Sequence, residues 1–172
     1  MKSHQVTSET SAIQYLTFKL GEEIYAVDVA KVREILDYSP ITKVPQTPEF
    51  MRGVINLRGS VVPVVDMRLK FSMSPTVKSV NTCIVVVEVI LEGEPTIIGA
   101  LVDSVQEVIE LEPTQIEPPP RMGTHLNVEF LRSMGKIGEK FIMILDIDKV
   151  FSTSEIIAVQ EALQLKENAA GS

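Results

Sequence analysis

The chain has 172 residues, a length that favours one domain or two small lobes over several domains. Sixteen basic and 23 acidic residues give a net charge of −7, which disfavours nucleic acid and anionic membrane surfaces as partners. Aromatic residues make up only 5% of the chain. Val, Ile and Leu must therefore form the core, and this composition favours strands.

The sequence also bears on the cellular compartment. The single cysteine, Cys83, has no partner for an internal disulfide and lies in the apolar run 83–87, where we expect a small buried side chain. A lone cysteine fits a reducing compartment. Residues 1–13 are mostly polar, lack the apolar segment of a signal peptide and are expected to form a disordered tail. No apolar run approaches the ~20 residues of a membrane-spanning helix, so we expect a cytoplasmic protein.

The first half of the chain predicts several short strands. Alternation of apolar and polar side chains predicts strands at residues 15–20, 24–27 and 32–36. The first of them is expected to be half-buried. Residues 53–66 predict a hairpin with its turn near Gly59, and Pro63 restricts the second strand to a sheet edge or a bulge. Asp66 is expected to cap a short helix that ends near Phe71.

The second half predicts strands again and ends in a helix. Apolar runs predict strands at residues 84–91, 97–109 and 141–145. Four prolines make residues 112–123 an irregular connection. Ile156, Val159 and Leu163 follow at helical spacing, which predicts one amphipathic helix over residues 155–166.

The two halves resemble each other. The pattern V-x-x-V-[RQ]-E-[IV] and an Asp followed five residues later by Phe occur twice in the same order, at residues 29–35 and 102–108, and at 66–71 and 146–151. These matches indicate a duplicated unit of about five strands, spanning residues 15–71 and 82–151. Short, numerous strands favour small closed sheets. The predicted fold class is therefore mainly β, with two barrel-like lobes packed through an apolar seam.

The sequence contains few candidates for chemistry. The only histidines, His4 and His125, have no second ligand at metal-binding spacing, so we expect no metal site and no cofactor. Nucleotide-binding and nucleophile motifs are absent. Carboxylates that could act as acid or base each follow a predicted strand, where turn or cap roles are expected: Asp28, Asp66, Asp103 and Asp146.

Two surface features have more than one interpretation. Arg58 beside the hairpin turn is either a solvated charge or a contact residue, because a forked cation at an edge is typical of interfaces. On the strand at 32–36, Val32 and Glu34 share one face while Arg33 and Ile35 share the other. This mixture of apolar and charged side chains fits the rim of an interface or an ordinary half-buried strand.

The longest motifs resemble those of the CheW family of chemotaxis adaptors. Residues 53–66 carry the pattern G-V-I-N-L-R-G-x-x-V-P-V-x-D, and the likeness extends over residues 14–152. The resemblance implies two five-stranded, SH3-like barrels around a shared apolar core. The predicted C-terminal helix and tail, at residues 153–172, lie beyond it. It also implies no enzymatic activity, and binding to the cytoplasmic tip of chemoreceptors and to the regulatory domain of the histidine kinase CheA.

The resemblance further implies which residues contact partners. Arg58 matches the family's functional arginine, and Val32 and Glu34 match its receptor-side pair. Other positions tied to binding in the family are matched by Gly53, Gly59, Gly99 and Val105. Association with membrane-bound receptor arrays through these partners is expected. The alternative is a small barrel that binds a ligand or performs hydrolysis with Asp28 or Asp66.

Overall fold

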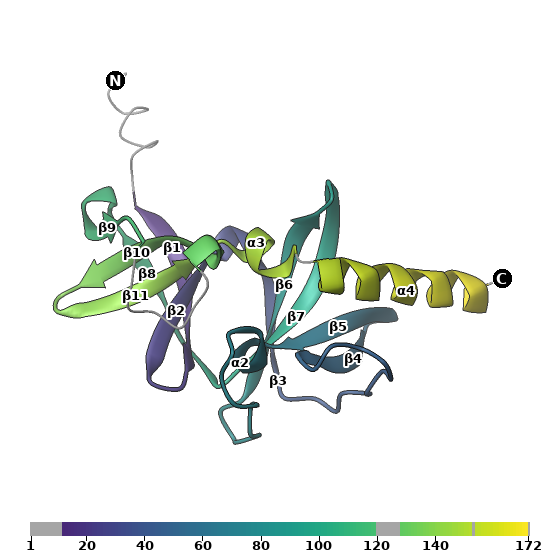
Figure 1. Cartoon of the computed structure of the whole chain (residues 1–172). Coiled ribbons are helices and arrows are strands. Elements are labelled where there is room, and N and C mark those ends of the chain that lie inside the picture. The colour runs from purple at the N-terminus through teal and green to yellow at the C-terminus, as the bar shows by residue number, and fades with distance from the viewer. Residues whose placement is uncertain (1–11, 120–127, 153, 172) are drawn as a thin grey trace.

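Two β-sheets contain about half of the residues that the computed structural model describes, which are 12–119, 128–152 and 154–171. We call the two units lobe A and lobe B; they lie side by side in Figure 1. Lobe A contains β1 (Ile13–Leu20), β2 (Glu23–Asp28), β8 (Ser104–Leu111), β9 (Ile116–Glu117), β10 (Leu131–Ile137) and β11 (Lys140–Leu145). Lobe B contains β3 (Val32–Asp37), β4 (Met51–Leu57), β5 (Ser60–Asp66), β6 (Cys83–Leu91) and β7 (Glu94–Val102).

Helix is confined to short segments and the C-terminal region, as predicted. The α-helices are α2 (Met67–Lys70), α3 (Ile147–Phe151) and α4 (Ser154–Gly171), and single 3₁₀ turns occur at Val29–Lys31, Pro113–Gln115 and Val128–Phe130. Asp66 caps α2 as predicted, since its carboxylate accepts from the N–H groups of Arg68 and Leu69. Helix α4 extends away from the lobes at its C-terminal end (Figure 1).

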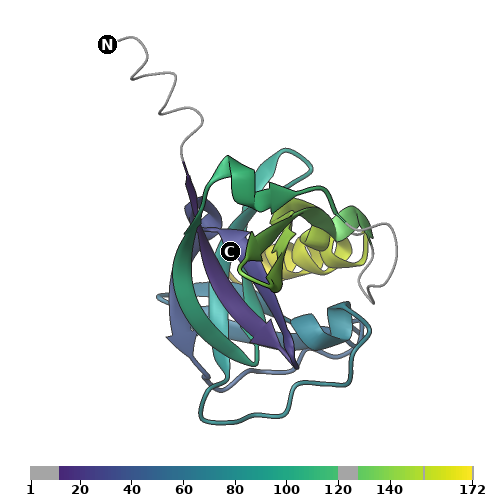
Figure 2. The same ribbon diagram turned by 90° about the vertical axis from the view of Figure 1, so that its left-hand side faces the viewer.

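Each lobe combines strands from both halves of the duplicated sequence. The strand order is β8-β1-β2-β11-β10-β9 in lobe A and β3-β6-β7-β5-β4 in lobe B. The first hairpin of each half, β1–β2 or β6–β7, therefore pairs with the later strands of the other half. The pairs β2–β11 and β5–β7 are parallel, whereas all other strand pairs within these sheets are antiparallel. Figure 2 shows β1, β2 and β8 adjacent in lobe A.

This exchange makes the chain cross between lobes twice. The first crossing is the 3₁₀ turn Val29–Lys31, between β2 and β3. The second is at Asp103, between β7 and β8. The prediction of one long strand over 97–109 was therefore wrong. Periodicity alone does not detect the break, because apolar side chains continue on both sides of Asp103 while the strand changes sheets.

The core has three parts. A central core lies between the lobes and includes Leu16, Phe18 and Leu20 from β1 together with Val85, Val87 and Val89 from β6. Smaller cores fill lobe B, around Val64 and Leu101, and lobe A, around Tyr15 and Ile144. Strands β1 and β6 are thus covered on both faces, which explains the long apolar run of β6.

The prediction that β1 is half-buried was wrong. Tyr15 and Thr17 are each only 2% exposed, although they lie on the face expected to meet solvent. The Thr17 hydroxyl donates a hydrogen bond of 2.7 Å to the carbonyl oxygen of Glu107 on β8. That bond satisfies the hydroxyl and makes its burial tolerable. A polar residue in an alternating pattern therefore does not by itself mark a solvent face.

Pro63 is not on a sheet edge, contrary to prediction. Strand β5 lies between β4 and β7 in lobe B. Pairing with β7 begins at Val64, one residue after the proline, so the missing N–H falls outside that ladder. The hairpin does contain a register shift, but it lies in β4 between Met51 and Gly53, whereas Pro63 pairs with Val54.

Candidate functional site

The hairpin between β4 and β5 displays Arg58 at its tip. Arg58 and Gly59 form a two-residue turn with φ angles of 50° and 89°, the conformation that matches the twist of paired strands. The side-chain oxygen of Asn56 accepts a 2.9 Å hydrogen bond from the Gly59 N–H and fixes the turn. The Arg58 side chain is 73% exposed, so the turn presents its guanidinium to solvent.

Arg58 forms an ion pair with Glu34 at the end of lobe B. Glu34 lies on β3, at one edge of the sheet, and the turn that carries Arg58 follows β4, at the other edge. The pair therefore joins the two edges of the curved sheet. The hydrogen bond from Arg58 to Glu34 raises the pKa of Arg58, and the guanidinium stays charged at every physiological pH.

A depression of about 550 Å³ lies beside this ion pair. The apolar part of its lining includes the half-buried side chains of Leu57, Val61 and Ile97. Charged side chains of Arg33, Glu34 and Arg58 line it as well. Protein interfaces combine apolar and polar surface, and this depression offers both.

Val32 and Val105 lie elsewhere, beside the seam between the lobes. They occupy equivalent places near the starts of β3 and β8, and both are half-buried against the central core. Val32 pairs with Val87, and Val105 pairs with Phe18. Neither valine lines the depression at Arg58. Arg58, Gly59 and Glu34 thus lie at the end of lobe B, whereas Val32 and Val105 lie beside the seam.

Gly53 has a structural role in β4. Its φ is +142°, and an added Cβ would lie 2.2 Å from the carbonyl oxygen of Thr42. Thr42 and Val54 exchange two backbone hydrogen bonds, of 2.8 and 2.9 Å, which hold the preceding loop against β4. Only glycine permits this close approach of two backbone segments.

Gly99 also lies away from the depression, inside lobe B. It pairs with Val64 of β5, and an added Cβ would meet the Cγ2 of Ile84 at 2.9 Å. The equivalent position in lobe A is Ala26, which pairs with Ile144 of β11 and is fully buried. Gly99 therefore supports close packing of the strands beneath the surface.

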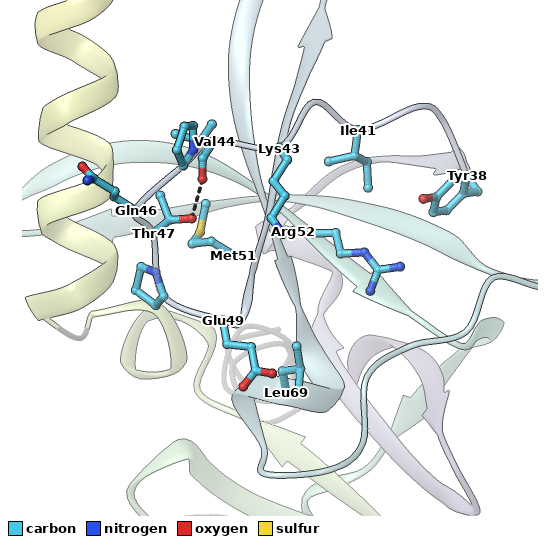
Figure 3. A pocket seen from close by; sticks show the side chains of 12 residues that line it. Tyr38, Ile41, Lys43, Val44, Gln46, Thr47, Glu49, Met51, Arg52 and Leu69 are labelled. Carbon is cyan, nitrogen blue, oxygen red and sulfur yellow. Dashed lines mark hydrogen bonds between the residues drawn. The ribbon is translucent and has the colours of Figure 1, made fainter.

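A second depression of lobe B, of about 630 Å³, contains none of the predicted site residues (Figure 3). The Arg52 side chain lines it, but its Nη1 donates to Asp66 Oδ2 at 3.0 Å and to the Thr76 carbonyl oxygen at 3.3 Å. The Thr47 hydroxyl donates a 2.9 Å bond to the Val44 carbonyl oxygen, which braces the loop. These polar groups stabilise the fold, so we base the functional argument on the depression at Arg58.

The candidate acid–base residues have the structural roles that were predicted, with one exception. Asp28, Asp66 and Asp146 each cap the helical turn that follows them. Asp103 instead forms an ion pair with Arg68. Cys83 is half-buried and packs against the central core.

The predictions about metals are tested only in part. Within the described ranges, no three His, Cys, Asp or Glu side chains are grouped as metal ligands would be. His4 and His125 lie outside those ranges, as do residues 1–11 of the tail predicted at residues 1–13. The end of that prediction was wrong, because Ile13 already begins β1.

Sequence reasoning missed two polar contacts at the chain crossings. Arg68 of α2 pairs with Asp103, and Asp148 of α3 pairs with Lys31. A signal for them exists in the sequence, because Arg68 and Asp148 each lie two residues after a matching Asp. This spacing shows that Arg68 and Asp148 occupy equivalent positions in the two halves. It does not identify the residues they pair with, because those pairings depend on the exchange of hairpins.

Among the residues that the structure describes, no helix has the length and apolar character needed to span a membrane. Residues 14–155 match the CheW-like domain family. The chain is 36% identical over 155 residues to the chemotaxis protein CheW of Klebsiella aerogenes, covering 90% of this chain and 91% of that protein. Identity to CheW of Thermotoga maritima is 30% over 153 residues, covering 87% and 93%.

A solved structure is similar over both lobes. The scaffolding protein TtCheW from Thermoanaerobacter tengcongensis superposes with a TM-score of 0.74 at 35% identity, covering 84% of this chain and 95% of that one. This match confirms the predicted architecture of two SH3-like lobes. The family match, the relatives and the fold agree, and the chain belongs to the CheW family of chemotaxis scaffold proteins.

Proposed function

We propose that this protein is a non-catalytic adaptor that couples the cytoplasmic tip of chemoreceptors to the regulatory domain of CheA. The observation that carries the proposal is the end of lobe B, where an exposed arginine and a carboxylate flank a depression with both polar and apolar side chains in its lining. Arginine is enriched among the residues that contribute most to binding at protein interfaces. The adaptor acts in the cytoplasm and joins membrane-bound receptor arrays through its partners.

The two groups of site residues suggest two binding surfaces. The receptor tip binds at the seam, beside Val32 and Val105, where half-buried apolar side chains adjoin the central core. The regulatory domain of CheA binds at the end of lobe B, where Arg58 is the main contact. Glu34 connects the surfaces, because it lies on the same strand as Val32 and pairs with Arg58. Gly53, Gly59 and Gly99 act by shaping the backbone that carries these contacts.

The geometry disfavours the alternative of a small hydrolytic barrel. Asp66 has no exposed surface, and its carboxylate is committed to Arg52, Thr76 and the start of α2. Asp28 accepts from the N–H of Ala30 and caps a turn. Neither carboxylate lines either of the two depressions described above.

The test uses the dependence of a bridging protein on stoichiometry. Purified receptor, CheA and this protein are combined, and kinase activity is measured while this protein is titrated across a wide range. We expect activity to rise and then to fall at high excess, because receptors and kinases then bind separate adaptor molecules. An enzyme gives a rise that saturates. Saturation that persists far beyond equimolar amounts would contradict bridging.

A variant separates the two explanations further. Asp66→Asn removes the carboxylate of the hydrolytic alternative, and circular dichroism reports whether the protein remains folded. The adaptor proposal predicts that the folded fraction of this variant still stimulates the kinase. Loss of stimulation in a fully folded Asp66→Asn protein would support the hydrolytic alternative instead.

A further inference from the structure

The crossing at Asp103 is held by a carboxylate that contacts both lobes. Asp103 accepts from Arg68 of α2 through Nε at 2.9 Å and Nη2 at 2.9 Å. The same carboxylate accepts a 2.8 Å bond from the N–H of Gly21, in the turn between β1 and β2 of lobe A. Helix α2 follows β5 of lobe B. Asp103 therefore connects the β1–β2 turn of lobe A to helix α2, which belongs to lobe B.

The crossing at Val29–Lys31 has a matching contact. Lys31 Nζ lies 2.9 Å from both carboxylate oxygens of Asp148 on α3, which follows β11 of lobe A. Asp148 Oδ1 also accepts a 2.9 Å bond from the N–H of Ile90, near the tip of the β6–β7 hairpin in lobe B. Again one carboxylate joins a cation to a backbone N–H across the two lobes.

The two contacts involve equivalent helix positions and neighbouring positions at the crossings, but their charges are reversed. Arg68 and Asp148 are each the second residue of a short helix that is capped by a matching Asp. In the first contact the helix carries the cation and the crossing carries the carboxylate. In the second contact the helix carries the carboxylate and the crossing carries the cation. The two ion pairs are therefore not copies of one another.

We propose that these two ion pairs are latches that hold the lobes in the orientation required at the receptor-binding seam. The inference rests on the proposed function of that seam. Lys31 directly precedes Val32, and Asp103 lies two residues before Val105. Each latch therefore fixes the backbone that positions one of the two seam valines. Arg68, Asp103, Lys31 and Asp148 are positioning residues, because they act through the valines.

Burial favours this role over that of ordinary surface pairs. The side chains of Arg68 and Asp103 are 21% and 25% exposed, and those of Lys31 and Asp148 are 28% and 35% exposed. Burial would raise the pKa of Asp103, but the hydrogen bonds from Arg68 and from the Gly21 N–H outweigh it and hold the pKa below its usual range. Exposed ion pairs rarely hold a fixed geometry, whereas these carboxylates are fixed by backbone bonds as well.

The test reverses and then restores one latch. Asp148→Lys places two cations together, and the double variant Lys31→Asp with Asp148→Lys gives the second latch the charge arrangement of the first. Lys149→Met, beside Asp148 on α3, is the control for a charge change without a latch. Spin labels at exposed Glu110 of lobe A and Asp37 of lobe B, with Cys83 replaced by alanine, report the distance between lobes. Binding to a soluble receptor tip is measured on the same proteins.

We expect Asp148→Lys to broaden the distance distribution and to weaken receptor binding by about fivefold to tenfold. The double variant should largely restore the narrow distance distribution and the receptor affinity. Lys149→Met should change neither the distance distribution nor the affinity. An unchanged distance distribution in Asp148→Lys would overturn the latch. A broadened distribution with unchanged binding would overturn its positioning role. If Asp148→Lys does not fold, Lys31→Met, which removes the pair without repulsion, is judged by the same two criteria.

The two readouts also separate this inference from the proposed function. Binding of the wild-type protein to the receptor tip tests the proposed function. If the wild-type protein does not bind, that function fails, and the positioning role fails with it. The distance distribution does not depend on any partner. The distance distribution alone decides whether the ion pairs fix the relative orientation of the lobes.

Discussion

Lobes A and B share one backbone plan but differ in the chemistry at equivalent positions. A constant offset of 80 residues relates β4, β5 and α2 of lobe B to β10, β11 and α3 of lobe A, including the register shift in the first strand of each hairpin. At the hairpin tips, lobe B presents Arg58 and Gly59, whereas lobe A presents Gly138 and Glu139. An arginine within the turn therefore belongs to only one of the two otherwise matching hairpins, because Lys140 of lobe A follows the turn at the start of β11.

The capping aspartates differ in the same way. Asp66 of lobe B is fully buried and binds Arg52 and Thr76 in addition to the start of α2. Its counterpart Asp146 is only half-buried, and its carboxylate accepts from the N–H of Lys149. The comparison teaches that shared features, such as the cap, maintain the fold. The features found in one lobe alone are the better candidates for function or for added stability.

The largest expected difference between equivalent positions concerns Gly53 and Ser133. Gly53→Ala should reduce the free energy of unfolding by about 4 kcal/mol, because it adds backbone strain and breaks the hydrogen bonds of the preceding loop. The new Cβ would lie 2.2 Å from the Thr42 carbonyl oxygen. Ser133→Ala should have little effect. Urea denaturation of both variants checks this, and similar losses would show that the close approach at Gly53 is unimportant.

A smaller difference is expected between the two capping aspartates. Asp66→Ala should cost about 3 kcal/mol of stability, because it leaves a partly buried Arg52 without its carboxylate. Asp146→Ala should cost about 1 kcal/mol, the usual value of a helix cap. Denaturant titrations of the two variants measure both. Equal losses of stability would mean that the two aspartates contribute equally to folding despite their different surroundings.

The pH dependence of stability tests the role of Asp103 at the second chain crossing. The pKa of Asp103 is lowered in the folded protein. Its ionised form therefore contributes stability that is complete above the unfolded-state pKa, near pH 4, and is lost as pH falls through the lower folded-state pKa. Asp103→Asn should be less stable at neutral pH and should show a weaker dependence on pH below about 4. Melting curves from pH 2 to 7 test this, and parallel curves would contradict it.

Local features of the fold were predictable from the sequence. The hairpin over 53–66 and the cap at Asp66 depend on neighbouring residues, and the structure confirms both. The helical spacing of Ile156, Val159 and Leu163 likewise gave the C-terminal helix, whose bounds are Ser154–Gly171. These signals are local because turn geometry, helix caps and periodicity are set within a few residues.

The exchange of hairpins was not predictable in the same way. It depends on which strands pair across long separations, from 35 residues between Val64 and Gly99 to 118 between Tyr25 and Met143, and apolar periodicity is the same for either pairing. For this reason the break at Asp103 and the two latches were missed. One useful signal was overlooked: the pattern E-F-x-R occurs at 49–52 and 129–132, with the same offset of 80. In both halves the Phe carbonyl oxygen accepts a hydrogen bond from the capping aspartate N–H.

The candidate site was predictable only through motif resemblance. An arginine beside a turn does not reveal its partner, and the ion pair with Glu34 depends on the curvature that brings β3 near the β4–β5 turn. The division of Val32 and Arg58 between two surfaces also follows from the fold. The assignment of these residues to partners stays a prediction.

The central claim is that the end of lobe B, and not its counterpart in lobe A, binds CheA through Arg58. Calorimetric titration of the CheA regulatory domain with Arg58→Ala tests it against Lys140→Ala, an exposed cation at the tip of the matching hairpin of lobe A. Both variants should melt within about 2 °C of the wild-type protein, since neither residue is buried. We predict that Arg58→Ala weakens binding by at least about tenfold, whereas Lys140→Ala changes it by less than about twofold. Equal effects of the two substitutions, or intact binding by Arg58→Ala, would contradict this account.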